Sequence, residues 1–192
     1  MDILVKKWYN KYSTIPKRKE RQMAGYKTLF KQMGCKCFNK MASRLAYEYA
    51  TCDMPRTYKS FAEVEGISEK CFKKLLEHAV IHHLVEDKMV DKMEEKASWN
   101  MREYNSTARM VASHYRDLRY KRKRFVYNVA RDFCKEEGMP IEPLLKRYMI
   151  DMQELRRFLD LAREEPEKYG TEKLLADIQH RIFFDQMPEL GL

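Results

Sequence analysis

The sequence predicts an all-α protein. Three observations support this prediction. Apolar residues recur with the 3.6-residue period of a helix along most of the chain, no stretch alternates polar and apolar residues as a strand does, and the 192 residues include only 6 Gly and 6 Pro. The chain is long enough to bury a sizeable core, in one domain or in two small ones.

The first predicted helices are amphipathic. Ser13 or Thr14 can cap a basic helix that begins near Pro16, a residue suited to a first helical turn. Residues 38–49 place apolar side chains at i, i+3, i+4, i+7, i+8 and i+11, which predicts a helix with one buried face. The segment 81–101 either continues as helix or pairs as a small wing. Helix is favoured because no Asn-Gly or Asp-Gly turn occurs in it.

The C-terminal helices are longer and end at recognisable stops. Residues 108–133 form one amphipathic run that ends by Gly138, and residues 141–159 form the next helix, which breaks near Pro166. Thr171 is then expected to cap a last helix.

A polar segment at residues 105–107 divides the chain into two predicted regions. Residues 1–104 contain the motif described below. Residues 105–192 are predicted to form a helical bundle that supports the first region, dimerises or binds a protein partner.

Charge alternates in blocks along the chain. Lys and Arg outnumber Asp and Glu by 14 to 4 in residues 1–60 and by 11 to 5 in residues 105–147, whereas acidic residues are in excess at 61–104 and 148–192. Two basic blocks that meet after folding would form an electropositive surface of the kind that attracts a phosphate backbone. The same composition also suits a basic protein whose charge only keeps it soluble.

The sequence argues against several classes of protein. No apolar run approaches the ~20 residues needed to cross a bilayer, so we expect a cytoplasmic protein without a membrane partner. The five cysteines follow no disulfide spacing, which is typical of a reducing compartment. His78 and His82 stand at i and i+4, but no third ligand follows at a familiar spacing, so we expect surface or interface histidines and no metal. No catalytic constellation or phosphate-binding glycine loop is recognisable, so neither an enzyme nor a cofactor is expected.

The stretch from Ser60 to Val80 carries the strongest functional signal. A helix-turn-helix needs small or flexible residues at its corner, because its two helices meet at roughly 90–120° through a short turn. Ala62 is small enough to let a second helix cross closely, and Gly66 can take the positive φ of the turn. Ser68 can cap the second helix. The predicted core of the corner consists of Phe61, Ala62, Gly66, Ile67, Phe72 and Leu75.

This pattern resembles the helix-turn-helix of bacterial and phage DNA-binding regulators, in which an alanine is followed four residues later by a glycine and then by apolar residues. The matching positions, in order, are Ala62, Gly66, Ile67, Phe72 and Leu75. Glu65 departs from the pattern, which usually has an apolar or small residue there, so the first helix is expected to be rotated or shorter. The resemblance covers only about residues 58–80.

The resemblance implies that the second helix enters the major groove, where each base pair displays a distinct pattern of donors and acceptors. Its predicted outward face consists of Ser68, Glu69, Lys70, Lys73, Lys74 and Glu77. Predicted contacts to the DNA backbone come from Arg56, Thr57, Tyr58, Lys59 and Ser60, at the start of the first helix. A second set of phosphate contacts is predicted at Arg119, Lys121, Arg122, Lys123 and Arg124, although a solvated helix face explains that run equally well.

The sequence therefore predicts a sequence-specific duplex DNA-binding protein, a transcriptional regulator that acts by occupying its site. A homodimer would place two recognition helices about one helical turn apart and favour a palindromic site. The alternative is a protein-interaction module, an inhibitor or adaptor of a nucleic-acid enzyme, in which the corner is structural. A hybrid of the two, of use to a phage or mobile element, combines an autoregulatory helix-turn-helix with a C-terminal half that binds a protein.

Overall fold

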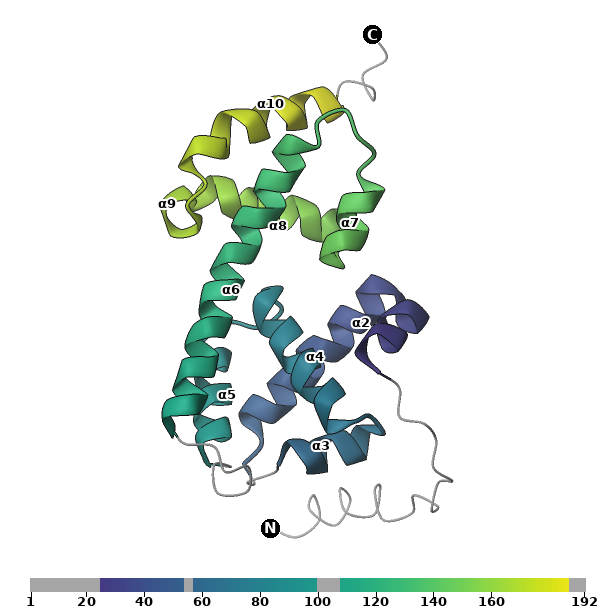
Figure 1. Cartoon of the computed structure of the whole chain (residues 1–192), viewed down its shortest axis with the longest axis vertical. Coiled ribbons are helices and arrows are strands. Elements are labelled where there is room, and N and C mark those ends of the chain that lie inside the picture. Colours follow the sequence, from purple (N-terminus) through teal and green to yellow (C-terminus); the bar gives the residue numbers. More distant parts are fainter. Residues whose placement is uncertain (1–24, 54–56, 100–107, 187–192) are drawn as a thin grey trace.

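The computed structural model describes residues 25–53, 57–99 and 108–186, and all regular structure in these ranges is helical, which confirms the predicted fold class (Figure 1). The elements are α2 (Tyr26–Thr51), α3 (Tyr58–Glu65), α4 (Glu69–Ile81), α5 (Asp87–Trp99), α6 (Ala108–Lys135), α7 (Glu142–Tyr148), α8 (Met152–Glu164), α9 (Pro166–Tyr169), the 3₁₀ turn η1 (Glu172–Leu174) and α10 (Leu175–Gln186). The helix predicted to begin near Pro16 lies outside the described residues.

Two hydrophobic cores share the long helix α6, which runs along one side of the molecule from the lower to the upper half of Figure 1. The first core joins α2, α3, α4 and α5 to the first turns of α6, as far as Leu118. The second core begins at Val126 and joins the last turns of α6 to α7, α8, α9 and α10. The predicted boundary at 104/105 falls among residues that the structure does not describe, and the cores themselves divide inside α6.

α4 is the central helix of the first core. It packs against α2, α3 and α6, and seven of its thirteen residues are buried. Successive buried residues are one to three positions apart, so they cover most of the circumference of the helix and leave a narrow side to solvent. The region predicted at 38–49 forms the second part of α2, which is kinked at Gly34 and crosses behind α4 in Figure 1.

Two predictions of helix boundaries need correction. The segment 81–101 is not one continuous helix, because α4 ends at Ile81 and His83 takes a positive φ of 54° before α5 begins. The helix predicted at 141–159 is likewise divided, because Met149 takes a left-handed conformation and Asp151 starts α8 with a capping box.

The role predicted for Thr171 is also wrong. Its side chain does not cap the following helix but donates a hydrogen bond of 2.5 Å from Oγ1 to the carbonyl oxygen of Ala162. Thr171 is fully buried, so this hydrogen bond links the residue before η1 to α8 in the protein interior.

Candidate nucleic-acid interface

The corner between α3 and α4 is built from local hydrogen bonds. Gly66 ends α3 in the left-handed region, at φ 67° and ψ 29°, a conformation that glycine adopts without steric cost. The N–H of Ile67 then donates to the carbonyl oxygen of Ala62 at 3.0 Å, which closes the end of α3. Ser68 caps α4, because its side chain accepts a hydrogen bond from the N–H of Cys71 at 3.1 Å.

Apolar packing stabilises the corner from the inside. Phe61 of α3 and Phe72 of α4 stack with ring centroids 5.5 Å apart and an interplanar angle of 10°. Ala62 is 2% exposed, so a larger side chain at this position would push α3 away from the core. Ile67 and Leu75 are buried in the same cluster. The structure therefore brings all six residues of the predicted motif core together, with Gly66 at the surface of the turn.

None of the six residues on the predicted outward face of α4 is buried. Lys70 and Lys74 are exposed, and the Nζ of Lys74 lies 6.0 Å from the centroid of the Tyr26 ring. We call Glu69, Lys70, Lys73, Lys74 and Glu77 the outer strip of α4. The strip is long enough to follow the floor of a groove for about 12 Å, at 1.5 Å per residue.

Part of the outer strip already has partners among the described residues. The Nζ of Lys73 lies 2.7 Å from the Oε1 of Glu69 and 5.1 Å from the centroid of the Tyr58 ring. Glu77 faces α6, where its Oε1 lies 3.7 Å from the Nε2 of His114. Lys70 and Lys74 are therefore the residues of the strip most available to an external ligand.

The residues predicted to contact the DNA backbone have mixed environments. Thr57 uses its hydroxyl to cap α3, accepting from the N–H of Ser60 at 3.1 Å, and Ser60 Oγ donates to the carbonyl oxygen of Thr57 at 3.0 Å. The Tyr58 ring stacks on Tyr49 at 5.2 Å. Lys59 is exposed, and Arg56 lies outside the described residues.

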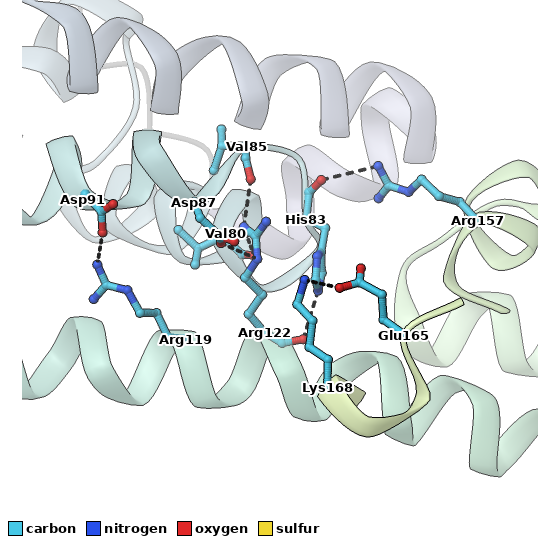
Figure 2. Close-up of polar contacts among 10 residues, drawn as sticks. All are labelled: Val80, His83, Val85, Asp87, Asp91, Arg119, Arg122, Arg157, Glu165 and Lys168. Atoms are coloured by element: carbon cyan, nitrogen blue, oxygen red, sulfur yellow. Dashed lines mark hydrogen bonds and ion pairs between the residues drawn. The ribbon is translucent and has the colours of Figure 1, made fainter. Parts of the chain in front are cut away.

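The basic run in α6 is divided between contacts to neighbouring elements and the solvent, and Figure 2 shows the two arginines that reach α5 and the end of α4. Arg119 reaches α5, where its guanidinium lies 2.6 Å from Asp91 and 2.6 Å from Glu94. Arg122 is 12% exposed, and its Nη1 donates to the carbonyl oxygens of Val85 at 2.8 Å and Val80 at 3.3 Å.

These contacts correct the prediction that Arg119 and Arg122 bind phosphates. Both arginines lie three residues apart on the side of α6 that also carries the buried Leu118, so the helical period directs them towards α4 and α5. Burial lowers the pKa of Arg122, although a neighbouring carboxylate at Asp87 acts in the opposite direction. Lys121 pairs with Asp117 at 2.6 Å, whereas Lys123 and Arg124 are exposed.

A chain of buried and partly buried hydrogen bonds connects α4 to α8, and the sequence analysis did not predict it. The hydroxyl of Tyr26 lies 2.8 Å from the Nδ1 of His78, and the Nε2 of His78 lies 2.7 Å from the Oδ1 of Asn39. The Nδ2 of Asn39 donates to the Oε1 of Glu154 at 2.7 Å. Because the amide oxygen of Asn39 can only accept, this network assigns the proton of a neutral His78 to Nε2.

The prediction of surface or interface histidines is therefore wrong for His78 and His82, which are 3% and 6% exposed. Burial lowers the pKa of His78 to about 4 and that of His82 well below its ordinary value. His83 makes a hydrogen bond of 3.1 Å from Nε2 to the carbonyl oxygen of Arg122, and burial also lowers its pKa to about 4. The sequence contains a signal for this burial, because apolar residues of α4 both precede and follow His78.

One group of potential metal ligands occurs among the described residues. One ligand atom from each of Cys35, Asp151 and Glu154 lies within 4.8 Å of the others. Hydrogen bonds within the group account for this geometry, because Glu154 completes the capping box of α8 and accepts from the thiol of Cys35 at 3.1 Å. Burial and the Glu154 carboxylate raise the pKa of Cys35 to about 12, which disfavours the thiolate that a metal requires.

Comparisons with known proteins give no further assignment. No protein-family model matches the chain, and neither the curated proteins nor the solved structures include a match. Among the residues that the structure describes, no helix has both the length and the apolar character to span a bilayer.

Proposed function

We propose that the chain binds duplex DNA at a specific sequence, with α4 as the recognition helix, and regulates transcription by occupying that site. The observation that supports the proposal best is the α3–α4 corner. It combines a left-handed Gly66, a capped second helix and a small buried Ala62 with exposed lysines on the outward side of α4.

The residues of the outer strip would have different roles. Lys70 and Lys74 would donate to guanine edges or to phosphates in the major groove. Glu69 holds Lys73 through their ion pair, so Lys73 would have to exchange this partner for a base or phosphate. Glu77 would repel a phosphate that approaches in the wrong register, which penalises loosely placed complexes.

At the first helix, Lys59 would contact the phosphate backbone. Thr57 and Ser60 would act indirectly, because their hydroxyl groups hold the N-terminus of α3 in place. Exposed N–H groups at such a helix start are themselves suited to a phosphate.

Selection from a pool of random-sequence duplexes at near-physiological salt tests the proposal. The wild type should enrich one sequence motif, and the Lys70→Ala/Lys74→Ala variant should lose that enrichment. A Lys92→Ala/Lys173→Ala variant is the matched control, because it removes two exposed lysines from other helices. The proposal fails if the wild type enriches no sequence, or if both double variants behave alike.

A second candidate function is that of a protein-interaction module in which the corner is structural. It is favoured by the packing of α4, which contacts α2, α3 and α6 and has Lys73 and Glu77 engaged within the protein. Absence of any enriched duplex from the selection above, with a normally folded wild type, is the result that this candidate predicts.

A further inference from the structure

The solvent side of α6 carries a second concentration of positive charge, separate from the outer strip of α4. Residues 109–135 contain nine Lys and Arg but only two acidic residues, Asp117 and Asp132. Both acidic side chains are already paired, Asp117 with Lys121 at 2.6 Å and Asp132 with Arg131 at 2.7 Å. The remaining cations are therefore not neutralised by the helix itself.

Four of these remaining cations form one continuous face with two tyrosines and with Arg131, the partner of Asp132. The helical period places positions i, i+7, i+11, i+14, i+15, i+18 and i+22 on the same side of a helix. We call the residues at these positions the α6 stripe: Arg109, Arg116, Tyr120, Lys123, Arg124, Tyr127 and Arg131. The buried residues of α6, such as Tyr115, Leu118 and Val129, lie on the opposite side. The stripe extends over 22 residues of helix, or about 33 Å.

The tyrosines of the stripe present aromatic surface between the cations. Tyr120 is 64% exposed, so most of its ring is open to solvent. Tyr127 is half-buried, with the guanidinium of Arg124 4.2 Å and that of Arg131 6.0 Å from the ring centroid. The two rings are seven residues, or about 10.5 Å, apart along the helix axis.

We propose that the α6 stripe binds a single strand of DNA without sequence preference. Phosphates would contact Arg116, Lys123 and Arg124, and unpaired bases would stack on Tyr120 and Tyr127, because every base offers a π face to an aromatic ring. A duplex keeps its bases stacked inside and cannot use the tyrosines in this way. An anionic membrane fits less well, because the stripe contains no aliphatic side chain that could enter the lipid.

The stripe and the outer strip of α4 are distinct surfaces with distinct ligands. The binding of a single strand does not depend on the corner between α3 and α4. The choice of DNA over RNA does rest on the proposed function, since stacking and phosphate contacts alone serve either polymer.

Fluorescence anisotropy with a labelled oligodeoxythymidine tests the proposal on the full chain. The wild type should bind, and a Tyr120→Ala/Tyr127→Ala variant should bind at least about tenfold more weakly, while Tyr120→Phe/Tyr127→Phe keeps the affinity because phenylalanine also stacks. Tyr47→Ala is the matched control, because Tyr47 is 55% exposed on α2, away from the stripe. Replacement of both Lys123 and Arg124 by Gln should reduce the salt dependence of log K by about 1.4, or about 0.7 for each phosphate that the variant no longer neutralises.

Further arms of the experiment separate this proposal from its alternatives and from duplex binding. Lys70→Ala/Lys74→Ala should leave single-strand binding unchanged, so the two proposals can fail independently. Equal affinities of the wild type and the Tyr→Ala variant would overturn the stacking proposal. Stronger binding to an RNA oligomer of uridine, or to vesicles of anionic lipid, would also overturn it.

Discussion

α4 and α6 are both rich in cations, but they use them in different ways. On α4, the exposed lysines Lys70 and Lys74 lie on the narrow side of the helix that is not packed. On α6, the densest basic run is divided between two environments. Arg119 and Arg122 point towards α4 and α5, whereas Lys123 and Arg124 are exposed to solvent. The charge density of a segment therefore says little about its available charge, because the helical period assigns each side chain to a face.

The largest expected effect comes from the inward-facing cations. Arg122→Ala should lower the free energy of unfolding by about 3 kcal/mol, because it removes the side-chain donor to the carbonyl oxygen of Val85 and one of two donors to that of Val80, which also accepts from the N–H of His83. Arg124→Ala, two residues along the same helix, should change it by no more than about 0.5 kcal/mol. Urea denaturation of the two variants measures this difference, and similar losses for both would contradict the division of the run.

The buried side of α4 should make the protein sensitive to acid. The pKa of His78 is about 4 in the folded protein and about 6.5 in the unfolded chain, so between these values the unfolded chain binds more protons. The contribution of neutral His78 to the free energy of unfolding should therefore be fully present above about pH 6.5 and should decrease as the pH falls towards 4. From these two pKa values, His78 accounts for a loss of about 2 kcal/mol between neutral pH and about pH 5.

Denaturation curves across this pH range, for the wild type and for His78→Gln, test the assignment. The variant should lose part of the pH dependence, whatever its stability at neutral pH, because glutamine does not titrate. An unchanged slope in the variant would show that His78 is not responsible.

A smaller effect is expected at the turn of the corner. Gly66→Ala should lower the free energy of unfolding by about 1 kcal/mol, because alanine disfavours the left-handed conformation. A Cβ atom at this position would meet no atom of the described residues within 4 Å, so steric overlap adds nothing. Gly66→Asn should cost less, since asparagine tolerates this conformation better. Equal stability of all three proteins, measured by thermal unfolding, would argue against a conformational requirement for glycine.

The sequence predicts the fold class and the corner well, because both depend on local rules. Apolar periodicity identifies the helices, and the spacing of Ala62, Gly66 and Ser68 identifies the turn and its cap. The break between α7 and α8 could also be predicted from the sequence, since Asp151 and Glu154 have the spacing of a capping box.

The remaining features depend on contacts between distant segments. The hydrogen bonds from His78 to Asn39 and from Asn39 to Glu154 join residues 39 and 115 positions apart, and no local pattern indicates them. The same is true of Arg122, whose acceptors lie on the loop between α4 and α5 and at the end of α4. Long-range pairing of this kind decides which cations are available to a ligand.

Modification of lysines in the presence and absence of DNA tests the central claim most directly. An amine-reactive reagent and mass spectrometry report the accessibility of every lysine in one experiment. We expect an excess of mixed-sequence duplex at low salt to protect Lys70 and Lys74 and to leave Lys92 and Lys173 unchanged, whereas a single strand should protect Lys123 instead. Equal modification of Lys70 and Lys74 with and without duplex would contradict the assignment of α4 as the recognition helix.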